Sequence, residues 1–388
     1  MRHLLVTQDF PPDLGGMARR HYELARWFPG HAMSVSTVAS DGAAGATPFP
    51  VLRQPFDFTA AKRFTSQMRW GRWLVANAAP YRALHCGNLR PVGYAVWWAA
   101  RRTGVPYFVY ANGGDILIDR AKSRRWHKRV AARRILADAA GVVANSAWTA
   151  GVTSDFMGEI GLGAPPPVAA IDLGTDPDHF HPRRDAGLLR RRHGLDDAPL
   201  LLTVARLVPH KGQDVGIRAL AQLAREFPAL VYVLVGDGPD QPRLAALAEE
   251  LGVADRVVFA GALGDDDVAD AYATATIYLG PSRLDRERYV EGFGISFVEA
   301  GASGTPVVAS NSGGIRSAVR QDETGILVPA DDPTAFAAAI RALLTDEPRR
   351  LAMGRAARAA AESHYNWARV ARETAAFVDR VLAERESA

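Results

Sequence analysis

Two carboxylates bracket a glycine-rich turn in the stretch EGFGISFVEA, where Glu291 precedes Gly292-Phe293-Gly294 and Glu299 follows. The turn opens a short apolar helix, so unpaired N–H groups and the positive end of a helix dipole should face it and favour an anion. Ionised carboxylates only accept hydrogen bonds, which makes hydroxyl groups their natural partners. The pattern therefore indicates a ligand with both phosphate and hydroxyl groups, such as a nucleotide sugar.

Two cations lie at the end of another predicted strand, in TVARLVPHKGQD, where Lys211 follows five residues after Arg206. A helix is predicted to begin near Gly212 or Gln213. Two positive side chains at the carboxyl end of a strand suit a diphosphate, and they would stabilise negative charge on a departing phosphate. Solvated surface charge is the alternative reading.

Two further glycine turns follow predicted strands, at Gly15-Gly16 and at Gly236 and Gly238 within VGDGPD. Glycine lets a backbone approach a bulky anion, although plain turn geometry is an equally good explanation of both turns. VGDGPD resembles half of a dinucleotide fingerprint. A complete G-x-G-x-x-G is missing, which argues against a nicotinamide enzyme.

Strands alternate with helices in both halves of the 388-residue chain, which is the pattern of a parallel sheet covered on both faces. The first half predicts strands at HLLVTQ, MSVSTVAS, ALHCGN, VPYFVYANGG and GVVANS. After a Pro- and Arg-rich connection at about 179–187, six strand candidates run from LLLTVARLV to GILVPA. The predicted fold class is α/β, with two doubly wound Rossmann-like domains facing each other across a cleft. Ligands of such sheets bind at the carboxyl ends of strands, where all these glycine turns lie.

Composition excludes several classes of protein. Apolar residues make up 48% of the chain and charged residues 23%, as in a globular protein with an ample core. The single Cys86 excludes an internal disulfide and a multi-cysteine metal site. The chain shows neither a signal peptide nor a run of 18 apolar residues, so a cytoplasmic location is expected. Residues 1–182 carry a net charge of +8 and the remainder −4, which indicates two units with different partners.

In their order along the chain, the motifs resemble those of family-4 retaining glycosyltransferases of the GT-B fold. The match covers nearly the whole chain: FPPDLGG, NGGD, NS-x-x-T, ARLVPHKG, VGDGP, VFAGAL, PSR, EGFGISFVEAGASGTPVVAS, SGGIRSAV and TGILVP. EGFGISFVEA corresponds to the E-x7-E signature of the family, which is highly specific in combination with R-x4-K. Within the family the chain is most similar to bacterial hexosyltransferases such as the phosphatidylinositol mannosyltransferases.

The resemblance implies a role for each matching residue. Arg206 and Lys211 would hold the donor diphosphate, with the Gly16 amide contributing from the other domain. Glu291 would bind hydroxyls of the transferred sugar, and Glu299 would accept from the ribose hydroxyls. The other donor-binding residues implied are Gly15, Gly236, Gly238, Ala262, Leu263, Gly292, Phe293, Gly294 and Ile295. Residues expected on the acceptor side are Asp115, Arg19 and Arg20.

The resemblance also implies a division of the chain. Residues 1–182 would bind the acceptor, residues 187–365 would bind the nucleotide sugar, and a helix in residues 366–388 would cross back onto the first domain. No metal or cofactor is expected, because Arg206, Lys211 and a helix N-terminus would provide the positive charge.

One residue departs from the family pattern inside the expected catalytic centre. The family usually has His-Gly-x-Asp/Glu where this chain has Asn112-Gly113-Gly114-Asp115. Asn112 keeps a hydrogen-bond donor but cannot carry a positive charge or shuttle a proton. We expect its amide to donate to a sugar hydroxyl. A second departure, Arg316 and Ser317 where the family has an acid, is of less consequence.

The expected activity is retaining transfer of a hexose from a GDP- or UDP-linked sugar. The acceptor would be a hydroxyl on a glycan, a glycolipid or a small natural product. The alternative, motivated by Asn112, is a catalytically silent nucleotide-sugar-binding protein. A phosphorylase of the same architecture would need a pyridoxal lysine, which the sequence does not identify.

Two basic segments bear on the partners of the first domain. Residues 60–75 and 119–136 contain Trp70, Trp73 and Trp126 among many arginines. Basic amphipathic helices with tryptophan bind anionic membranes. This would suit a lipid-linked acceptor and a peripheral position on the inner face of the membrane. An Arg-rich solvated face with a soluble acceptor is the alternative, and no nucleic acid partner is expected.

Overall fold

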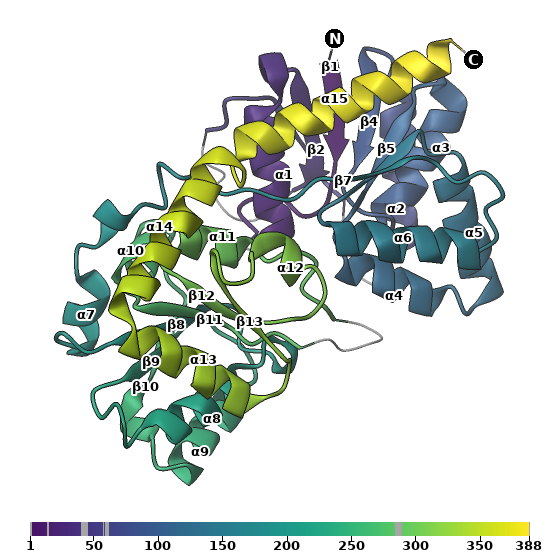
Figure 1. Ribbon diagram of the computed structural model, residues 1–388. Helices are drawn as coiled ribbons and strands as arrows, with labels where there is room; N and C mark the ends of the chain where they lie inside the picture. Colours follow the sequence, from purple (N-terminus) through teal and green to yellow (C-terminus); the bar gives the residue numbers. More distant parts are fainter. Residues whose placement is uncertain are drawn as a thin grey trace. The chain divides into compact units, whose positions relative to one another are not determined.

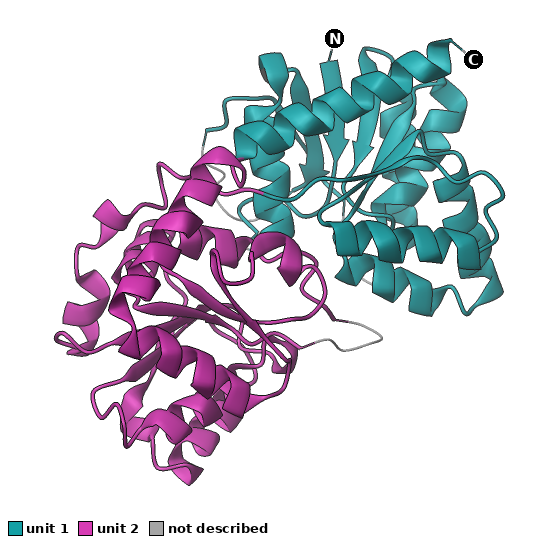
Figure 2. Ribbon diagram, in the orientation of Figure 1, with its two compact units in different colours: residues 1–173, 367–388 teal, residues 174–366 magenta. Residues whose placement is uncertain are grey.

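The computed structural model describes residues 2–13, 15–39, 46–56, 58, 62–283 and 289–387. It contains two compact units, one formed by residues 1–173 and 367–388 and the other by residues 174–366 (Figure 2). Each unit is built on one parallel sheet, so the predicted class of two doubly wound α/β units is confirmed. The predicted connection at 179–187 lies inside the second unit.

The first unit contains a seven-stranded sheet whose central strands are buried, while its two edge strands are short and half-buried. The two edge strands are the ones that the sequence patterns did not predict, because each has only two or three consecutive apolar residues. In spatial order the strands are β3 (Val51–Gln54), β2 (Met33–Val38), β1 (Arg2–Val6), β4 (Tyr81–Cys86), β5 (Tyr107–Ala111), β6 (Gly141–Ala144) and β7 (Val168–Ala170).

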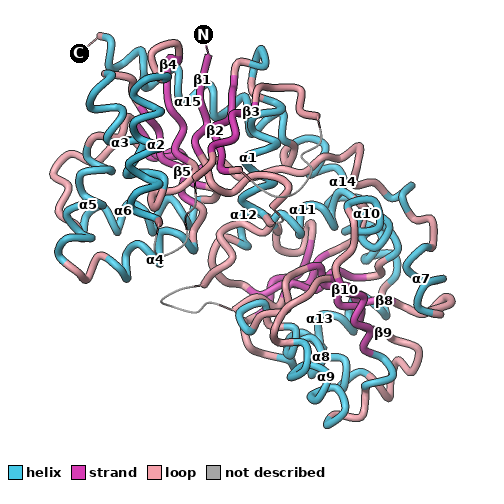
Figure 3. Tube along the Cα trace, turned by 180° about the vertical axis from the view of Figure 1, so that it is seen from behind, coloured by secondary structure: helices cyan, strands magenta, loops and turns pink. Residues whose placement is uncertain are grey.

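Helices cover both faces of this sheet. Helices α1 and α15 lie in front of the sheet in Figure 1. Helices α2 and α3 lie in front of it in Figure 3, which shows the molecule from behind. The helices are α1 (Gly16–Trp27), α2 (Arg63–Asn77), α3 (Val92–Thr103), α4 (Gly114–Lys122), α5 (Trp126–Ala137), α6 (Ala147–Glu159) and α15 (Trp367–Glu386), with a 3-10 turn η1 (Pro29–His31).

The second unit contains all six predicted strands. In spatial order they are β10 (Val257–Gly261), β9 (Val231–Val235), β8 (Leu200–Val204), β11 (Ile277–Gly280), β12 (Val307–Ser310) and β13 (Gly325–Val328). Its helices are α7 (Leu188–His193), α8 (Gln213–Leu223), α9 (Gln241–Glu250), α10 (Asp265–Thr274), α11 (Ile295–Ala302), α12 (Ile315–Ala318), α13 (Pro333–Thr345) and α14 (Glu347–Ser363), with 3-10 turns η2 (Pro182–Arg184), η3 (Pro209–Lys211) and η4 (Ala254–Arg256). Helices α8, α9 and α13 lie on one face of the sheet, and α10, α11 and α14 lie on the other (Figure 1).

The last helix, α15, belongs to the first unit although it ends the chain. It packs against α1, and the ring of Phe377 lies 5.9 Å from that of Phe108 on β5. Gly141 on β6 makes room for this ring, because a Cβ there would lie 2.9 Å from the end of Phe377. The apolar stripe of the helix therefore completes the core on this face of the sheet.

Burial corrects the expected surface role of one tryptophan. Trp70 is fully buried, and its indole N–H donates to Ser36 Oγ at 3.0 Å, so the prediction that it lies on a membrane-facing surface is wrong. Trp73 is half-buried against the core, whereas Trp126 is 76% exposed. On the amphipathic helix α2, Trp70 and Trp73 pack against the core, whereas Arg69 and Arg72 face water. Within the described part of the chain, no helix is both long and apolar enough to cross a membrane.

Candidate functional site

The glycine-rich turn predicted to bind an anion lies at the N-terminus of α11. Gly294 precedes the helix with a φ of +92°, and a Cβ there would lie 2.3 Å from the ring of Phe297. Only glycine fits this conformation and this space. Phe293 is 1% exposed, so the turn is anchored by a buried side chain, while Ile295 begins the helix. The first amides of α11 therefore lie at the turn that the sequence predicted to bind an anion.

Lys211 and Glu291 meet although they are 80 residues apart. Lys211 Nζ lies 2.6 Å from Glu291 Oε2, and both side chains are about four-fifths buried. The contact forms because Lys211 follows β8 and Glu291 follows β11, which are neighbours in the sheet. The sequence predicted a phosphate-binding cation and a hydroxyl-binding carboxylate as separate features. The structure brings them together beside the N-terminus of α11.

Glu299 has a different partner. It lies one turn into α11, and its Oε2 accepts a hydrogen bond from the Tyr272 hydroxyl at 3.0 Å. Burial of Tyr272 and the nearby charge of Glu299 raise the pKa of the tyrosine well above its ordinary value, so the tyrosine remains a donor. This bond fixes the carboxylate and leaves lone pairs for further donors.

The Arg206 turn is held by backbone contacts that only glycine allows. A Cβ on Gly236 would lie 2.2 Å from Ala205 O, and one on Gly238 would lie 2.1 Å from Leu207 O. In this structure the two glycines therefore face the protein backbone, and their absent side chains let β8 and β9 end side by side. Ala262 lies at the end of the next strand, and its N–H donates to Asp237 Oδ2 at 3.3 Å. Leu263 follows it and is half-buried.

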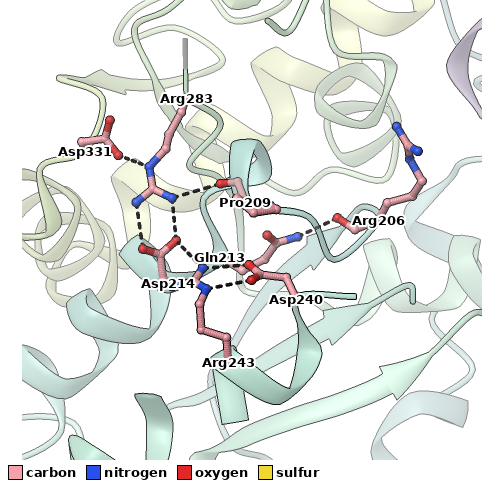
Figure 4. A network of polar contacts seen from close by, with 8 residues as sticks. All are labelled: Arg206, Pro209, Gln213, Asp214, Asp240, Arg243, Arg283 and Asp331. Carbon is pink, nitrogen blue, oxygen red and sulfur yellow. Dashed lines mark hydrogen bonds and ion pairs between the residues drawn. The ribbon is translucent and has the colours of Figure 1, made fainter. Parts of the chain in front are cut away.

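The side chain of Arg206 is exposed and has no polar partner among the described residues. Its carbonyl accepts from Gln213 Nε2 at 3.0 Å, which fixes the backbone (Figure 4). The guanidinium extends away from the surrounding ion pairs (Figure 4). Arg206 is therefore a positioned cation that can bind an external anion.

In the first unit, Gly15 and Gly16 form the N-terminus of α1. Gly15 has a φ of +139°, a conformation that favours glycine, and a Cβ there would meet no described atom within 4 Å. Both glycines are exposed. Arg19 lies one turn further along α1 and is half-buried. Its backbone N–H donates to Gly15 O at 3.0 Å.

Asn112 is fully engaged within the first unit. Its Oδ1 accepts from Arg20, and its Nδ2 donates to Asp115 Oδ2 at 3.1 Å and to Gly87 O at 3.3 Å. These partners fix the orientation of the amide and use both of its hydrogens. The predicted donation from Asn112 to a sugar hydroxyl would require one of these bonds to break.

Arg20 and Asp115 flank this amide. Arg20 is 2% exposed and also donates to the carbonyls of Ala111 and Val143, so it lies beneath Asn112 rather than on a surface that an acceptor could reach. Burial lowers the pKa of Arg20 to about 10, which leaves it charged at neutral pH. Burial raises the pKa of Asp115, although hydrogen bonds from Asn112 oppose the shift.

A carboxylate that the sequence analysis did not single out lies beside this group. Asp9 follows β1, and its Oδ2 accepts from Asn88 Nδ2, which follows β4, at 3.2 Å. Asn88 is 4% exposed, and its Oδ1 has no partner among the described residues. Because β1, β4 and β5 are adjacent, Asp9, Asn88 and Asn112 meet at one edge of the sheet. A polar residue just after each of these buried strands was the signal in the sequence.

Two family profiles match the chain. The profile described as "Glycosyl transferases group 1" matches residues 186–360, and "Glycosyl transferase 4-like domain" matches residues 15–157. Among curated proteins, the chain is 32% identical to a GDP-mannose-dependent alpha-(1-6)-phosphatidylinositol monomannoside mannosyltransferase of Mycobacterium tuberculosis, over 97% of this chain and 98% of that protein. It is 35% identical to a D-inositol 3-phosphate glycosyltransferase of Streptomyces scabiei, over 73% of this chain and 64% of that protein.

Solved structures share the fold over almost the whole chain. Sucrose-phosphate synthase from Thermosynechococcus elongatus superposes with a TM-score of 0.81 at 22% identity, covering 99% of both chains. The Anabaena protein HepE in complex with UDP superposes with a TM-score of 0.79 at 21% identity, covering 98% of this chain and 100% of that one.

The Asp9 carboxylate should cost the folded protein stability at neutral pH. Burial and the charge of Asp115 raise the pKa of Asp9 to about 6, although the hydrogen bond from Asn88 lowers it in part. The folded state then binds this proton more tightly than the unfolded chain, so stability falls as pH rises from about 4 to above 6. We expect Asp9→Asn to raise the free energy of unfolding by about 1 kcal/mol at pH 7.5 and to have little effect below pH 4.

Urea unfolding at both pH values measures this difference. Asp155→Asn, which changes an exposed carboxylate on α6 of the same unit, is the control and should have little effect at either pH. If Asp9→Asn destabilises the protein equally at both values, the carboxylate is a structural requirement and not a strained group.

Proposed function

This chain belongs to the glycosyl transferases group 1 family and is a glycosyltransferase that uses a nucleotide sugar. We propose that it transfers mannose from GDP-mannose to a hydroxyl of an acceptor that contains inositol phosphate. The anomeric configuration of the mannose would be retained. The names of the relatives support this choice, because they combine GDP-mannose, phosphatidylinositol mannoside and inositol phosphate. The observation that carries the proposal is Lys211 against Glu291 at the N-terminus of α11. A cation, a carboxylate that accepts from hydroxyls and the N-terminus of a helix at one place suit a sugar linked to a diphosphate.

The second unit would bind the donor. Lys211, Arg206 and the first amides of α11 would surround the diphosphate, and negative charge that develops on the leaving phosphate would be stabilised by these fixed positive groups. Glu291 would exchange part of its contact with Lys211 for hydroxyls of the mannose. Glu299, held by Tyr272, would accept from the ribose hydroxyls.

The first unit would bind the acceptor and bring its hydroxyl to the sugar. In the reaction the bond between the anomeric carbon and the phosphate oxygen breaks, and a bond to the acceptor oxygen forms on the same face. The leaving phosphate takes the proton of the acceptor hydroxyl, so no protein base is needed. Asp9 and Asp115 could accept from other acceptor hydroxyls, while Arg20 and Asn112 hold this edge of the sheet in place.

A lipid-linked acceptor would bring the first unit to an anionic membrane. Helix α2 presents a row of side chains at helical spacing in which Phe64 is 73% exposed, Met68 is 37% exposed and Arg72 is exposed, with Arg69 beside them. Apolar side chains flanked by arginine suit peripheral binding to anionic lipid. Residues 60 and 61 of the predicted basic segment lie outside the described residues. The exposed Trp126 on α5 provides a second such position.

A panel of nucleotides tests the donor assignment. GDP should raise the thermal unfolding midpoint more than UDP or ADP does, because a ligand that binds only the folded state stabilises it. GDP-mannose should then be consumed in the presence of a mannosylated phosphatidylinositol, and NMR of the product should show the α-anomer. Stabilisation without transfer to any acceptor would identify a silent nucleotide-sugar binder. If no nucleoside diphosphate stabilises the protein, the proposal is wrong.

Loss of either cation should nearly abolish transfer. Lys211→Ala and Arg206→Ala each remove a charge-assisted contact to the diphosphate, which should cost about 3 kcal/mol or more in the transition state. Steady-state kinetics and circular dichroism measure activity and fold. Arg341→Ala is the control, since it breaks a surface ion pair with Glu226 in the same unit. Turnover near that of the wild type in either variant would refute the assignment.

Membrane binding should depend on the charge of α2. Replacing Arg69 and Arg72 by Glu should weaken binding to vesicles of anionic lipid by more than about 1 kcal/mol per site, since each change reverses a charge. Sedimentation with vesicles at low salt measures the bound fraction. Reversal of the exposed Arg372 and Arg385 on α15 changes the net charge equally and should have a smaller effect. If the wild type does not bind such vesicles at low salt, the acceptor is soluble.

A further inference from the structure

The turn that carries Lys211 is held on its far side by Arg283. The Nη1 of Arg283 donates to Pro209 O at 3.0 Å (Figure 4). The backbone N–H of Arg283 donates to His210 O at 2.8 Å. Two consecutive carbonyls of η3 are thereby directed toward Arg283. The partial negative charges of these carbonyl oxygens therefore lie on the Arg283 side of the turn, where Arg283 donates a hydrogen bond to each.

The guanidinium of Arg283 is itself fixed by two acids. It makes a two-pronged contact with Asp214 at 2.8 Å for each bond, and a further ion pair with Asp331 (Figure 4). Although burial alone would raise it, the pKa of Asp214 lies below its usual value because Arg283 donates to it and Arg243 lies nearby. Asp214 is therefore ionised at neutral pH. Since Asp214 lies in the first turn of α8, this pair ties the cation-bearing turn to the helix that follows it.

The network continues to the Arg206 side of the same turn. Arg243 lies 3.7 Å from Asp214 and makes two bonds of 2.7 Å to Asp240 (Figure 4). The N–H of Asp240 donates in turn to Leu207 O at 3.1 Å. Both ends of the segment between the two predicted diphosphate ligands are thus attached to one framework of paired charges.

We propose that Arg283 is a positioning residue for the donor diphosphate, and that it acts through the turn that presents Lys211. This inference rests on the proposed donor site. Arg283 does not need to touch the donor: it holds the carbonyls of Pro209 and His210 so that the turn keeps the conformation in which Lys211 reaches Glu291. Lysine could not replace it fully, because a single ammonium group lacks the planar fork that bonds Asp214 twice.

A second contact supports this role of the turn. The ring of Tyr289 stacks on that of His210, with centroids 4.5 Å apart and an angle of 5° between the planes. The turn is therefore held by Arg283 through its backbone and by Tyr289 through a side chain. An element held at two places has few alternative conformations, which is what a preorganised charge site requires.

A double-mutant cycle separates positioning from general stability. Isothermal titration with GDP, or with UDP if the wild type prefers it, gives the Kd of the wild type, Arg283→Ala, Lys211→Ala and the double variant. We expect Arg283→Ala to weaken binding roughly tenfold in the wild-type background and less than about twofold in the Lys211→Ala background, because coupled residues are not additive. Arg283→Lys should fall between Arg283→Ala and the wild type.

Arg341→Ala serves as the matched control and should change the Kd in neither background. If Arg283→Ala weakens binding by the same factor in both backgrounds, or in neither, Arg283 does not act through Lys211 and the inference is wrong. Should Arg283→Ala fail to fold by circular dichroism, the cycle is repeated with Arg283→Lys, to which the same criterion applies. A wild type that binds no nucleoside diphosphate overturns the proposed function, and the inference with it.

Discussion

The ion pair between Lys211 and Glu291 is the contact on which the candidate site of the second unit depends. It joins a turn after β8 to a turn after β11, and both must take one conformation for the two side chains to meet. Close backbone packing sets those conformations. A Cβ on Gly212 would lie 2.0 Å from Pro281 O, and one on Gly313 would lie 2.6 Å from Glu291 O. Glycine at these positions allows the turns to approach, and the ion pair follows.

The two units hold their polar groups in different ways. In the second unit, Arg283 and Asp214 form a partly exposed framework of paired charges around the turn that places Lys211 against Glu291. In the first unit, the buried Arg20 has no carboxylate in direct contact among the described residues. It donates to two carbonyls and to the Asn112 side chain, which in turn donates to Asp115. Paired charges of this kind suit the proposed binding of a diphosphate. The neutral amide of Asn112, between the charges of Arg20 and Asp115, holds this edge of the sheet rigid without placing a net charge there.

Membership of the family follows from similarity along the whole chain, whereas the solved structures, at 21–22% identity, establish the fold. The chemistry has to be argued from this chain's own residues. Lys211, Glu291 and Glu299 lie where a nucleotide sugar could bind. The sequence resemblance places Asn112 where the family usually has a histidine. The hydrogens of its amide already have partners, so a simple exchange of one donor for another does not describe this site.

The sequence by itself determined the features that depend on local order along the chain. Alternating apolar segments identified two parallel sheets, and Gly294, Arg206 and Lys211 could be assigned to strand ends because strand, turn and helix follow one another in the sequence. The short edge strands β3 and β7 were missed because so few residues carry their pattern.

Only the tertiary structure decided which strand ends are neighbours. Periodicity gives each strand but not the order of strands in a sheet, so the adjacency of β8 with β11, and hence the pairing of Lys211 with Glu291, could not be read from the sequence. The burial of Trp70, the hydrogen bonds of Asn112 and the contacts of Arg283 have the same origin. Each depends on atoms from segments that are distant in the sequence, so these interactions contribute to stability only once the chain has folded.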